Sequence, residues 1–185
     1  MRFSKKEVEF GVKGLIVVVL AAAATTGRAQ YFLPVSVGAC GGFSVGHGPV
    51  AELSQGEVFA NWNIPLQTES KSGWYLQTKL NLSAGALGGY GQVAAVGTLG
   101  PGLALGRHGF PLWLEGGAGP TLISHYRFGP VDFGQDLQFT SYVGLNLDLS
   151  RHWRVGYRFQ HMSNAGLSSS NPGLNLNMFA LSYAF

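Results

Sequence analysis

The chain has 185 residues, of which 46% are apolar and only 11% are charged, whereas a typical soluble domain has about 25% charged residues. Its formal net charge is +3, but five of the 12 basic and two of the nine acidic residues fall within 1–29, so seven of each remain and the rest is formally neutral. A formally neutral chain of this kind does not have the excess of basic residues that a nucleic-acid-binding surface needs. The 28 glycines are about double the usual share of roughly 7%, and few charges with many glycines favour strands that face lipid.

The first 29 residues have the pattern of a secretory signal peptide. Basic residues begin this segment, an apolar stretch covers 15–24, and a small-x-small cleavage site lies at 27–29. The apolar stretch is shorter than the roughly 20 residues that a membrane-spanning helix needs, although an uncleaved anchor is the alternative. We therefore expect residues 1–29 to be a cleaved signal and residues 30–185 to form one domain.

Eight segments with alternating apolar and polar side chains follow, separated by stretches rich in turn-forming residues. They cover 33–45, 57–64, 74–83, 92–105, 110–124, 137–149, 152–162 and 176–185. The alternation is clearest in 137–149, and a period of two residues is that of a β-strand with two different faces. The chain from residue 30 onward is long enough for eight spans of about 10 residues each. The pattern predicts an all-β fold, an eight-stranded antiparallel transmembrane β-barrel of the bacterial outer membrane.

A barrel of eight strands has an interior that side chains fill. The alternation turns Glu115, Asp148, Arg154 and Arg158 inward, where they should pair because an unpartnered buried charge is costly. This predicts a structural network, and a filled interior argues against a small pore. Cys40 is the single cysteine of the chain, so no internal disulfide can form, and we assign it no chemistry.

The last two segments carry the most information about function. Their bulky apolar side chains share one face, namely Trp153, Val155, Tyr157 and Phe159 on the first and Phe179, Leu181, Tyr183 and Phe185 on the second. His161 and Ser163 continue the same face. Barrels of this class keep both termini and the short turns in the periplasm, so the first of the two strands runs outward. The eight residues from Trp153 to His161 correspond to about 26 Å of strand and about 19 Å of depth at a tilt near 45°.

A lone His-x-Ser at this depth is also typical of the border where the apolar band ends, but its surroundings are specific. The pair lies in His161-x-Ser163-Asn164-Ala165-Gly166-Leu167, which is followed by Asn171-x-Gly173. This pattern resembles the PagL-type lipid A deacylases, outer-membrane esterases that remove an acyl chain from lipopolysaccharide. The resemblance also includes the terminal strand and, more loosely, the eight-strand layout.

The resemblance implies a role for each matching residue. Ser163 would be the nucleophile, and His161 the general base that takes its proton. Gly166, through its backbone N–H, and Asn171, through its side chain, would hold the oxyanion, and Asn164 would shape the loop. The resemblance implies lipid A as the substrate and no cofactor, and we find no ligand spacing for a metal among the histidines.

One position departs from the family pattern. The acidic residue that orients the histidine in the family, usually a glutamate 14 positions further on, is Asn175 here, and no Asp or Glu follows Asp148. Alternation places Asn175 and Asn177 on the same face as the His–Ser pair. An amide can fix the imidazole tautomer through its oxygen, but it cannot balance the charge of imidazolium.

These observations predict an outer-membrane esterase that hydrolyses an acyl ester of lipid A with the catalytic residues Ser163, His161 and Asn175. The alternative is a weak or inactive eight-stranded barrel with a structural or adhesive role at the cell surface. The expected partners are lipopolysaccharide in the outer leaflet, the outer-membrane insertion machinery and, as an option that the sequence leaves open, a second copy in a homodimer.

Overall fold

A computed structural model describes residues 33–185, and the expected signal at 1–29 lies outside them. Eight long strands make up the barrel: β1 (Ser36–Ser44), β2 (Ser54–Glu69), β3 (Trp74–Gly89), β4 (Gln92–Arg107), β5 (Leu112–Ile123), β8 (Leu137–Asp148), β9 (Trp153–Ser163) and β10 (Leu174–Ala184). A 3₁₀ turn, η2 (Gly48–Glu52), precedes β2, and a small hairpin of β6 (Arg127–Phe128) and β7 (Val131–Asp132) lies between β5 and β8. No helix of the described part is long and apolar enough to cross a membrane.

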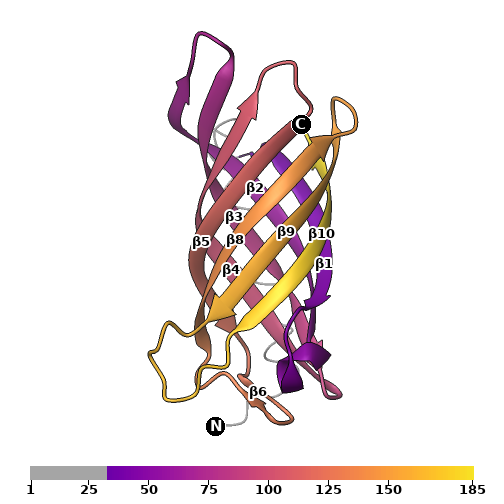
Figure 1. The fold of residues 1–185 in the computed structure, drawn as a ribbon, viewed down its shortest axis with the longest axis vertical. Helices are drawn as coiled ribbons and strands as arrows, with labels where there is room; N and C mark the ends of the chain where they lie inside the picture. The colour runs from indigo at the N-terminus through magenta and orange to yellow at the C-terminus, as the bar shows by residue number, and fades with distance from the viewer. Residues whose placement is uncertain (1–32) are drawn as a thin grey trace, which may run out of the picture. The chain divides into compact units, whose positions relative to one another are not determined.

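The barrel is closed by antiparallel pairing of its first and last strands (Figure 1). β1 pairs with β10 from Ser36↔Ala184 to Ser44↔Leu176, and every other neighbouring pair is also antiparallel. Closure leaves no strand edge with unpaired N–H and C=O groups, which is the condition for a sheet to exist in hydrocarbon. The expected fold class is therefore confirmed.

The connections differ between the two ends of the barrel. At one end, near the C-terminus in Figure 1, short turns join β2 to β3, β4 to β5 and β8 to β9. At the other end lie the two-residue turn 90–91 and three longer connections, 45–53, 124–136 and 164–173. In outer-membrane barrels the short turns and both termini are periplasmic, so the end with the longer connections is the outer end.

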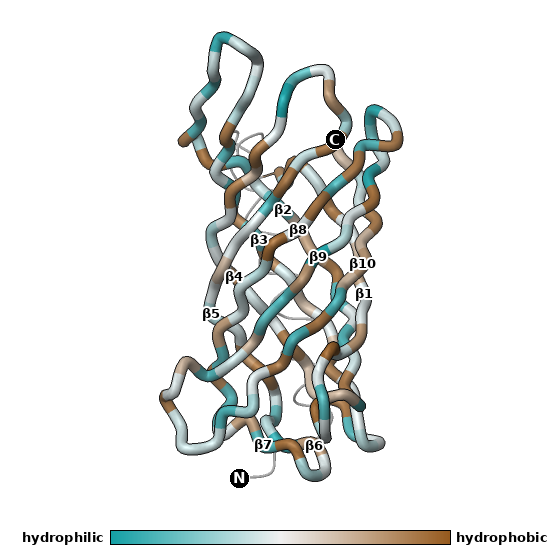
Figure 2. Tube along the Cα trace, in the orientation of Figure 1, coloured by the Kyte–Doolittle hydropathy of each residue, from teal (hydrophilic) through white to brown (hydrophobic). Residues whose placement is uncertain are grey.

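The outward-facing side chains form an apolar surface. Each of the eight strands exposes large hydrophobic side chains, for example Phe43, Val58, Leu82, Leu99, Leu114, Val143, Tyr157 and Phe179, which are 36–63% exposed. Hydrophobic and hydrophilic positions alternate along the strands in Figure 2. Monomeric soluble proteins rarely expose continuous apolar surface of this extent, whereas lipid-facing barrel walls require it.

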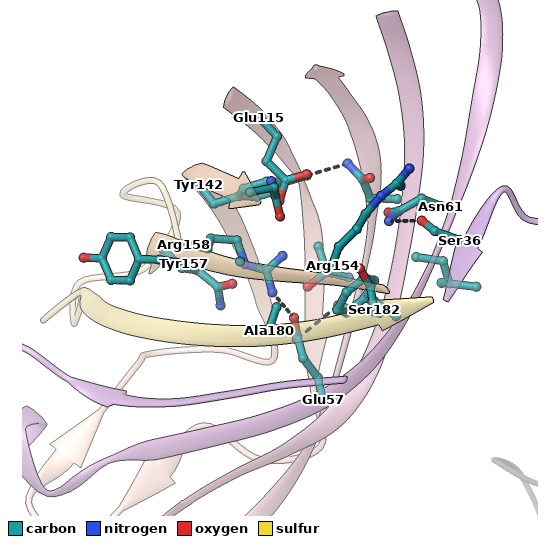
Figure 3. Close-up of a pocket in the computed structure, with 18 of the residues that line it drawn as sticks. Ser36, Glu57, Asn61, Glu115, Tyr142, Arg154, Tyr157, Arg158, Ala180 and Ser182 are labelled. Atoms are coloured by element: carbon teal, nitrogen blue, oxygen red, sulfur yellow. Dashed lines mark hydrogen bonds and ion pairs between the residues drawn. The ribbon is translucent and has the colours of Figure 1, made fainter. Parts of the chain in front are cut away.

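The interior contains the expected charged network, with one different partner. Arg154 pairs with Asp148 at 2.9 Å, as the alternation predicts. Arg158 pairs with Glu57 at 2.6 Å (Figure 3). The Cys40 sulfur lies 2.9 Å from the same guanidinium nitrogen. The sequence does not single out Glu57, because the antiparallel register places it opposite Cys40 on β1 and sequence separation alone does not reveal this pairing.

Apolar side chains close the interior towards the outer end. Buried residues from six barrel strands and from the connections before β2 and between β5 and β8 form one cluster, which includes Leu53, Leu87, Val96, Ile123, Phe128, Phe133, Met162, Leu174 and Leu176. Below it, the polar mid-barrel cavity measures only about 50 Å³, room for a few water molecules. The barrel is therefore filled at its middle and closed at its outer end, as the sequence predicts, while a pocket of about 510 Å³ opens at the short-turn end beside Lys79, Trp113 and Asp148.

We predict that Glu57→Gln destabilises the barrel strongly. The substitution leaves the Arg158 guanidinium, whose side chain is only 14% exposed, without a counter-charge, and breaking a buried ion pair in this way costs about 3–5 kcal/mol. The urea midpoint for unfolding from lipid vesicles should fall. Glu69→Gln is the control, because Glu69 is 57% exposed in its pair with His108 and should leave the midpoint nearly unchanged. Equal midpoints for the two variants would contradict a structural role for the buried pair.

Candidate active site

His161 and Ser163 lie at the outer end of β9 on the face that points away from the lumen. The neighbours Gln160 and Met162 are buried inside at 2% and 0% exposure, while Phe159 on the outward face is 38% exposed. His161 and Ser163 are partly exposed, continuing the outward row. The apolar wall therefore leads directly to an imidazole and a hydroxyl at the level where the outer connections begin.

Asn175 on β10 lies directly opposite His161 in the β9–β10 ladder. The imidazole Nδ1 and the amide Oδ1 are 2.7 Å apart. An amide oxygen can only accept, so this hydrogen bond requires the proton on Nδ1. Nε2 is then the unprotonated nitrogen, and the histidine is held in the tautomer of a general base.

Ser163 is two residues from His161, about 7 Å along the strand. The structure contains no hydrogen bond between the serine hydroxyl and the imidazole among residues 33–185. Catalytic hydrogen bonds are often long in substrate-free proteins and tighten when substrate binds. Ser141, across from His161 on β8, presents a second exposed hydroxyl beside the imidazole.

The connection from β9 to β10 begins with a tight turn. The Leu167 N–H donates to the Asn164 carbonyl at 3.1 Å, and both residues between them have positive φ, 55° at Ala165 and 79° at Gly166. Positive φ at both central positions is the geometry of a type I′ turn. Glycine adopts it freely, but alanine at positive φ is strained, and such strain is concentrated at functional sites.

Asn164 holds this turn against the rest of the outer end. Its side chain is 0% exposed, and its Nδ2 donates to the Phe133 carbonyl at 2.9 Å and the Ser170 carbonyl at 2.7 Å. Its Oδ1 accepts from the Gly166 N–H at 2.9 Å. The contact with Phe133 ties the β9–β10 connection to the β5–β8 connection, a link that the sequence analysis missed because nothing in the local pattern of 124–136 signals it.

The two residues matched to an oxyanion hole lie in the same connection. The Asn171 Oδ1 atom accepts a hydrogen bond from the Asn164 N–H at 3.2 Å. The Nδ2 group of Asn171 can therefore donate to another acceptor. The Gly166 N–H is already donated to Asn164. Both groups are close to the turn. Of the two, it is the Asn171 Nδ2 group that has no hydrogen-bond acceptor within residues 33–185.

Gly173 supports the position of the imidazole from the other end of the connection. Its φ is 66°, and a Cβ at this position would lie 3.2 Å from His161 Cε1. Glycine is therefore favoured there by the backbone conformation, and a side chain would also press on the imidazole ring. The β9–β10 connection thus contributes to the site through Asn164, Gly166, Asn171 and Gly173.

Among residues 33–185, no carboxylate takes the place of the missing acidic residue in the hydrogen bonds and ion pairs of His161. No Asp or Glu follows Asp148 in the sequence. Asp132, in the adjoining β5–β8 connection, is already bonded to the Arg127 side chain at 3.0 Å and to the Gly134 N–H at 2.8 Å. The imidazole is thus oriented by a neutral amide.

The fold and the site together define a class of protein, an eight-stranded outer-membrane barrel with a His–Ser pair on its lipid-facing wall. The chain matches the family described as "Lipid A 3-O-deacylase (PagL)" over residues 55–184. This match covers more than half of the chain, and the chain belongs to that family. Membership and the closed barrel also identify it as a bacterial outer-membrane protein.

Individual relatives agree with the family assignment. The chain is 36% identical over 73 residues to lipid A deacylase PagL of Bordetella bronchiseptica and 36% identical over 62 residues to that of Pseudomonas aeruginosa. These matches cover 40% and 34% of this chain and 41% and 36% of the two relatives, so the chain spans about two fifths of their length. The crystal structure of the outer membrane enzyme PagL superimposes with a TM-score of 0.70 at 20% identity, covering 81% of this chain and 99% of that one. This likeness shows the common barrel fold.

We predict that Asn164→Ala loosens the β9–β10 connection without unfolding the barrel. The change leaves the buried Phe133 carbonyl without its partner, at a cost of about 1–3 kcal/mol, and it also removes the bonds to the partly buried Ser170 carbonyl and the Gly166 N–H. Amide hydrogen exchange in 164–173 should accelerate while exchange in the β9–β10 ladder stays slow. Ser169→Ala, at an exposed position in the same connection, should change neither rate. Unaltered exchange in the Asn164 variant would show that these hydrogen bonds do not hold the connection.

Proposed function

We propose that this protein is an outer-membrane esterase that hydrolyses an acyl ester of lipid A, with Ser163 as the nucleophile and His161 as the general base. The observation that carries the proposal is the 2.7 Å bond between His161 Nδ1 and Asn175 Oδ1, which leaves Nε2 free on a wall that faces the substrate's own leaflet. Membership of the PagL family supports lipid A as the substrate.

The position of the proposed site on the lipid-facing wall determines how the substrate reaches it. The ester of a glycolipid in the outer leaflet lies near the head groups, at the depth reached by the end of β9, so lateral diffusion along the wall brings the ester to Ser163. The acyl chain continues towards the bilayer midplane over the apolar surface of β9 and β10. No passage through the lumen is involved, which fits a barrel that is filled at its middle and closed at its outer end.

The first chemical step transfers the acyl group to Ser163. His161 Nε2 accepts the hydroxyl proton as Oγ attacks the ester carbonyl, and the oxygen of that carbonyl becomes an oxyanion. Nε2 then returns the proton to the leaving sugar oxygen, so the C–O bond to the sugar breaks and an acyl-enzyme forms. In the second step water gives a proton to Nε2 and attacks the acyl carbonyl, and Ser163 leaves with that proton.

The oxyanion needs donors at the β9–β10 connection. Asn171 Nδ2 is the first candidate, because its Oδ1 is held by the Asn164 N–H and the amide is thereby oriented. The Gly166 N–H can contribute after its bond to Asn164 is exchanged on substrate binding. A donor of this kind contributes about 3 kcal/mol to transition-state stabilisation, and each is placed by the turn that Ala165 and Gly166 form.

Asn175 makes the proposed enzyme slower than one with a carboxylate at this position. The amide orients the ring and fixes its tautomer, but it does not neutralise the imidazolium that forms in both steps. In a serine protease triad, replacing the carboxylate by an amide lowers turnover about 10⁴-fold, and the remaining machinery still exceeds the uncatalysed reaction.

Mass spectrometry of lipid A tests the proposed function. Outer membranes carrying the intact protein should contain lipid A that has lost one ester-linked acyl chain, and those carrying Ser163→Ala or His161→Ala should not. Ser141→Ala is the matched control, because this exposed serine flanks His161 on the neighbouring strand and its loss should leave deacylation intact. Unaltered lipid A in all samples would favour the second candidate, a structural or adhesive surface barrel. Loss of activity in Ser141→Ala alone would reassign the nucleophile.

We predict that Asn175→Glu raises the esterase rate. A carboxylate opposite His161 would stabilise the imidazolium, with a gain of at least tenfold and at most about 10⁴-fold, the factor measured for the reverse change in a protease triad. Initial rates on a dispersed acyl ester measure the effect. Asn175→Gln is the control, since glutamine has the reach of glutamate without its charge and should give no increase. Equal rates for the Glu and Gln variants would contradict the charge argument.

A further inference from the structure

A pocket enters the barrel at its periplasmic end, the end opposite the candidate active site. It measures about 510 Å³ and lies among the short turns, near the C-terminus in Figure 1. This volume is typical of small-molecule sites, which measure roughly 300–1,000 Å³. Lys79 on β3, Trp113 on β5 and Arg154 on β9 line it. Trp113 and Arg154 also line the mid-barrel cavity, so they form the floor of the pocket.

Lys79 is a buried cation without an anionic partner among residues 33–185. Its side chain is 8% exposed, and its Nζ lies 4.1 Å from the centroid of the Trp113 ring. No carboxylate oxygen of residues 33–185 lies within 4.0 Å of Nζ, and Glu115 lines the mid-barrel cavity instead of this pocket. An indole face attracts a cation, but it leaves the ammonium donors unused, and a buried charge normally needs a hydrogen-bonded counter-charge.

Arg154 adds a second set of unused donors beside Lys79. Its Nε lies 2.9 Å from Asp148 Oδ1, which also accepts from Trp113 Nε1 at 3.1 Å. The two terminal nitrogens of the guanidinium have no acceptor within residues 33–185. The guanidinium carbon lies 5.7 Å from the centroid of the same indole ring. The floor therefore combines two cations with one carboxylate, which leaves one positive charge in excess.

The other acidic groups around the pocket do not neutralise this charge. Glu69 pairs with His108 at 3.3 Å, and both side chains are more than half exposed. The C-terminal residue Phe185 also lines the pocket, but it is 73% exposed, and its carboxylate makes no ion pair with Lys79 or Arg154 in the described part of the chain. An anion from the periplasm is therefore the missing partner.

An irregularity in β2 begins opposite Lys79. Asn63 pairs with Lys79 and Gln67 pairs with Gln77, so the three residues 64–66 of β2 face a single residue of β3. The Gln77 Nε2 group donates to the Ile64 carbonyl at 2.7 Å and to the Thr78 carbonyl at 2.8 Å, which holds the bulge in place. Bulges are common at barrel rims and beside functional sites, where they redirect side chains.

We propose that this pocket is a periplasmic binding site for a small organic carboxylate, which Lys79 Nζ and the terminal N–H groups of Arg154 hold. A monoanion matches the single excess positive charge, and the planar guanidinium matches the geometry of a carboxylate. Asn63 and Gln67 line the same pocket and are exposed, so their amides can bond peptide groups. The ligand class is a short amide-containing chain that ends in a carboxylate. This inference does not depend on the proposed esterase activity.

Nuclear magnetic resonance of the protein in micelles tests the site with two matched probes, N-acetyl-dialanine and its C-terminal amide. The carboxylate should shift the Trp113 indole N–H resonance saturably, and the amide should bind at least about tenfold more weakly, because it loses charge-assisted hydrogen bonds. Lys79→Met should weaken carboxylate binding by a similar factor. Lys71→Met is the control, because Lys71 is exposed on the β2–β3 turn at the same end and should leave binding unchanged.

Three results would overturn the site: no saturable shift, equal affinity for the two probes, or unchanged binding in Lys79→Met. Inorganic phosphate should bind more weakly than N-acetyl-dialanine, since a second negative charge exceeds the single positive charge in excess. Equal or tighter binding of phosphate would overturn the assignment to a carboxylate.

Stability distinguishes a binding role of Lys79 from a structural one. Without ligand, Lys79→Met removes an unpaired buried charge and keeps an apolar stem over Trp113, so the urea midpoint should stay or rise. N-acetyl-dialanine should raise the midpoint of the unmodified protein, because it binds the folded state, and it should leave that of Lys79→Met unchanged. A lower midpoint for ligand-free Lys79→Met would assign Lys79 to the structural network and overturn the proposal.

Discussion

The whole structure depends on the requirement that backbone N–H and C=O groups in hydrocarbon have partners. Pairing β1 with β10 meets this requirement by closing the sheet. Closure also fixes the register of every strand, and register assigns each side chain to the lumen or the lipid, since a shift of one residue would exchange the two faces. His161 and Ser163 face lipid for the same reason that Gln160 and Met162 are buried.

Register also brings together the groups of the candidate site. His161 and Asn175 are 14 positions apart in sequence, yet they are direct partners in the β9–β10 ladder. The rigid ladder places the two side chains, and the connection of ten residues between the strands places the groups of the turn. The two strands hold the His161–Asn175 bond in place before substrate arrives, and groups fixed in advance in this way favour electrostatic stabilisation of a transition state.

Period-two alternation was sufficient to predict the eight barrel strands and the outward position of His161, because each face of a membrane barrel meets a different solvent. It underestimated β2 and β3, which continue to Glu69 and Gly89 beyond the expected ends at 64 and 83, and it did not predict the small β6–β7 hairpin. The Arg154–Asp148 pair was predictable for the same reason. Glu57 as the partner of Arg158 was not, since it depends on which strands face each other across the lumen. The contact between Asn164 and Phe133 was likewise hidden, because irregular connections have no periodicity and their packing is decided in three dimensions. The catalytic roles of His161, Ser163 and Asn175, and those of Gly166, Asn171 and Asn164, are predictions.

The apolar cluster at the outer end has a consequence for the cell. Phe128 and Phe133 are fully buried there with Leu53 and Leu174, so a plug of apolar side chains closes the outer end of the barrel. Nutrients, dyes and antibiotics gain no route through such a cylinder. The abundance of the protein in the envelope can therefore rise without weakening the permeability barrier, a freedom that no water-filled porin has.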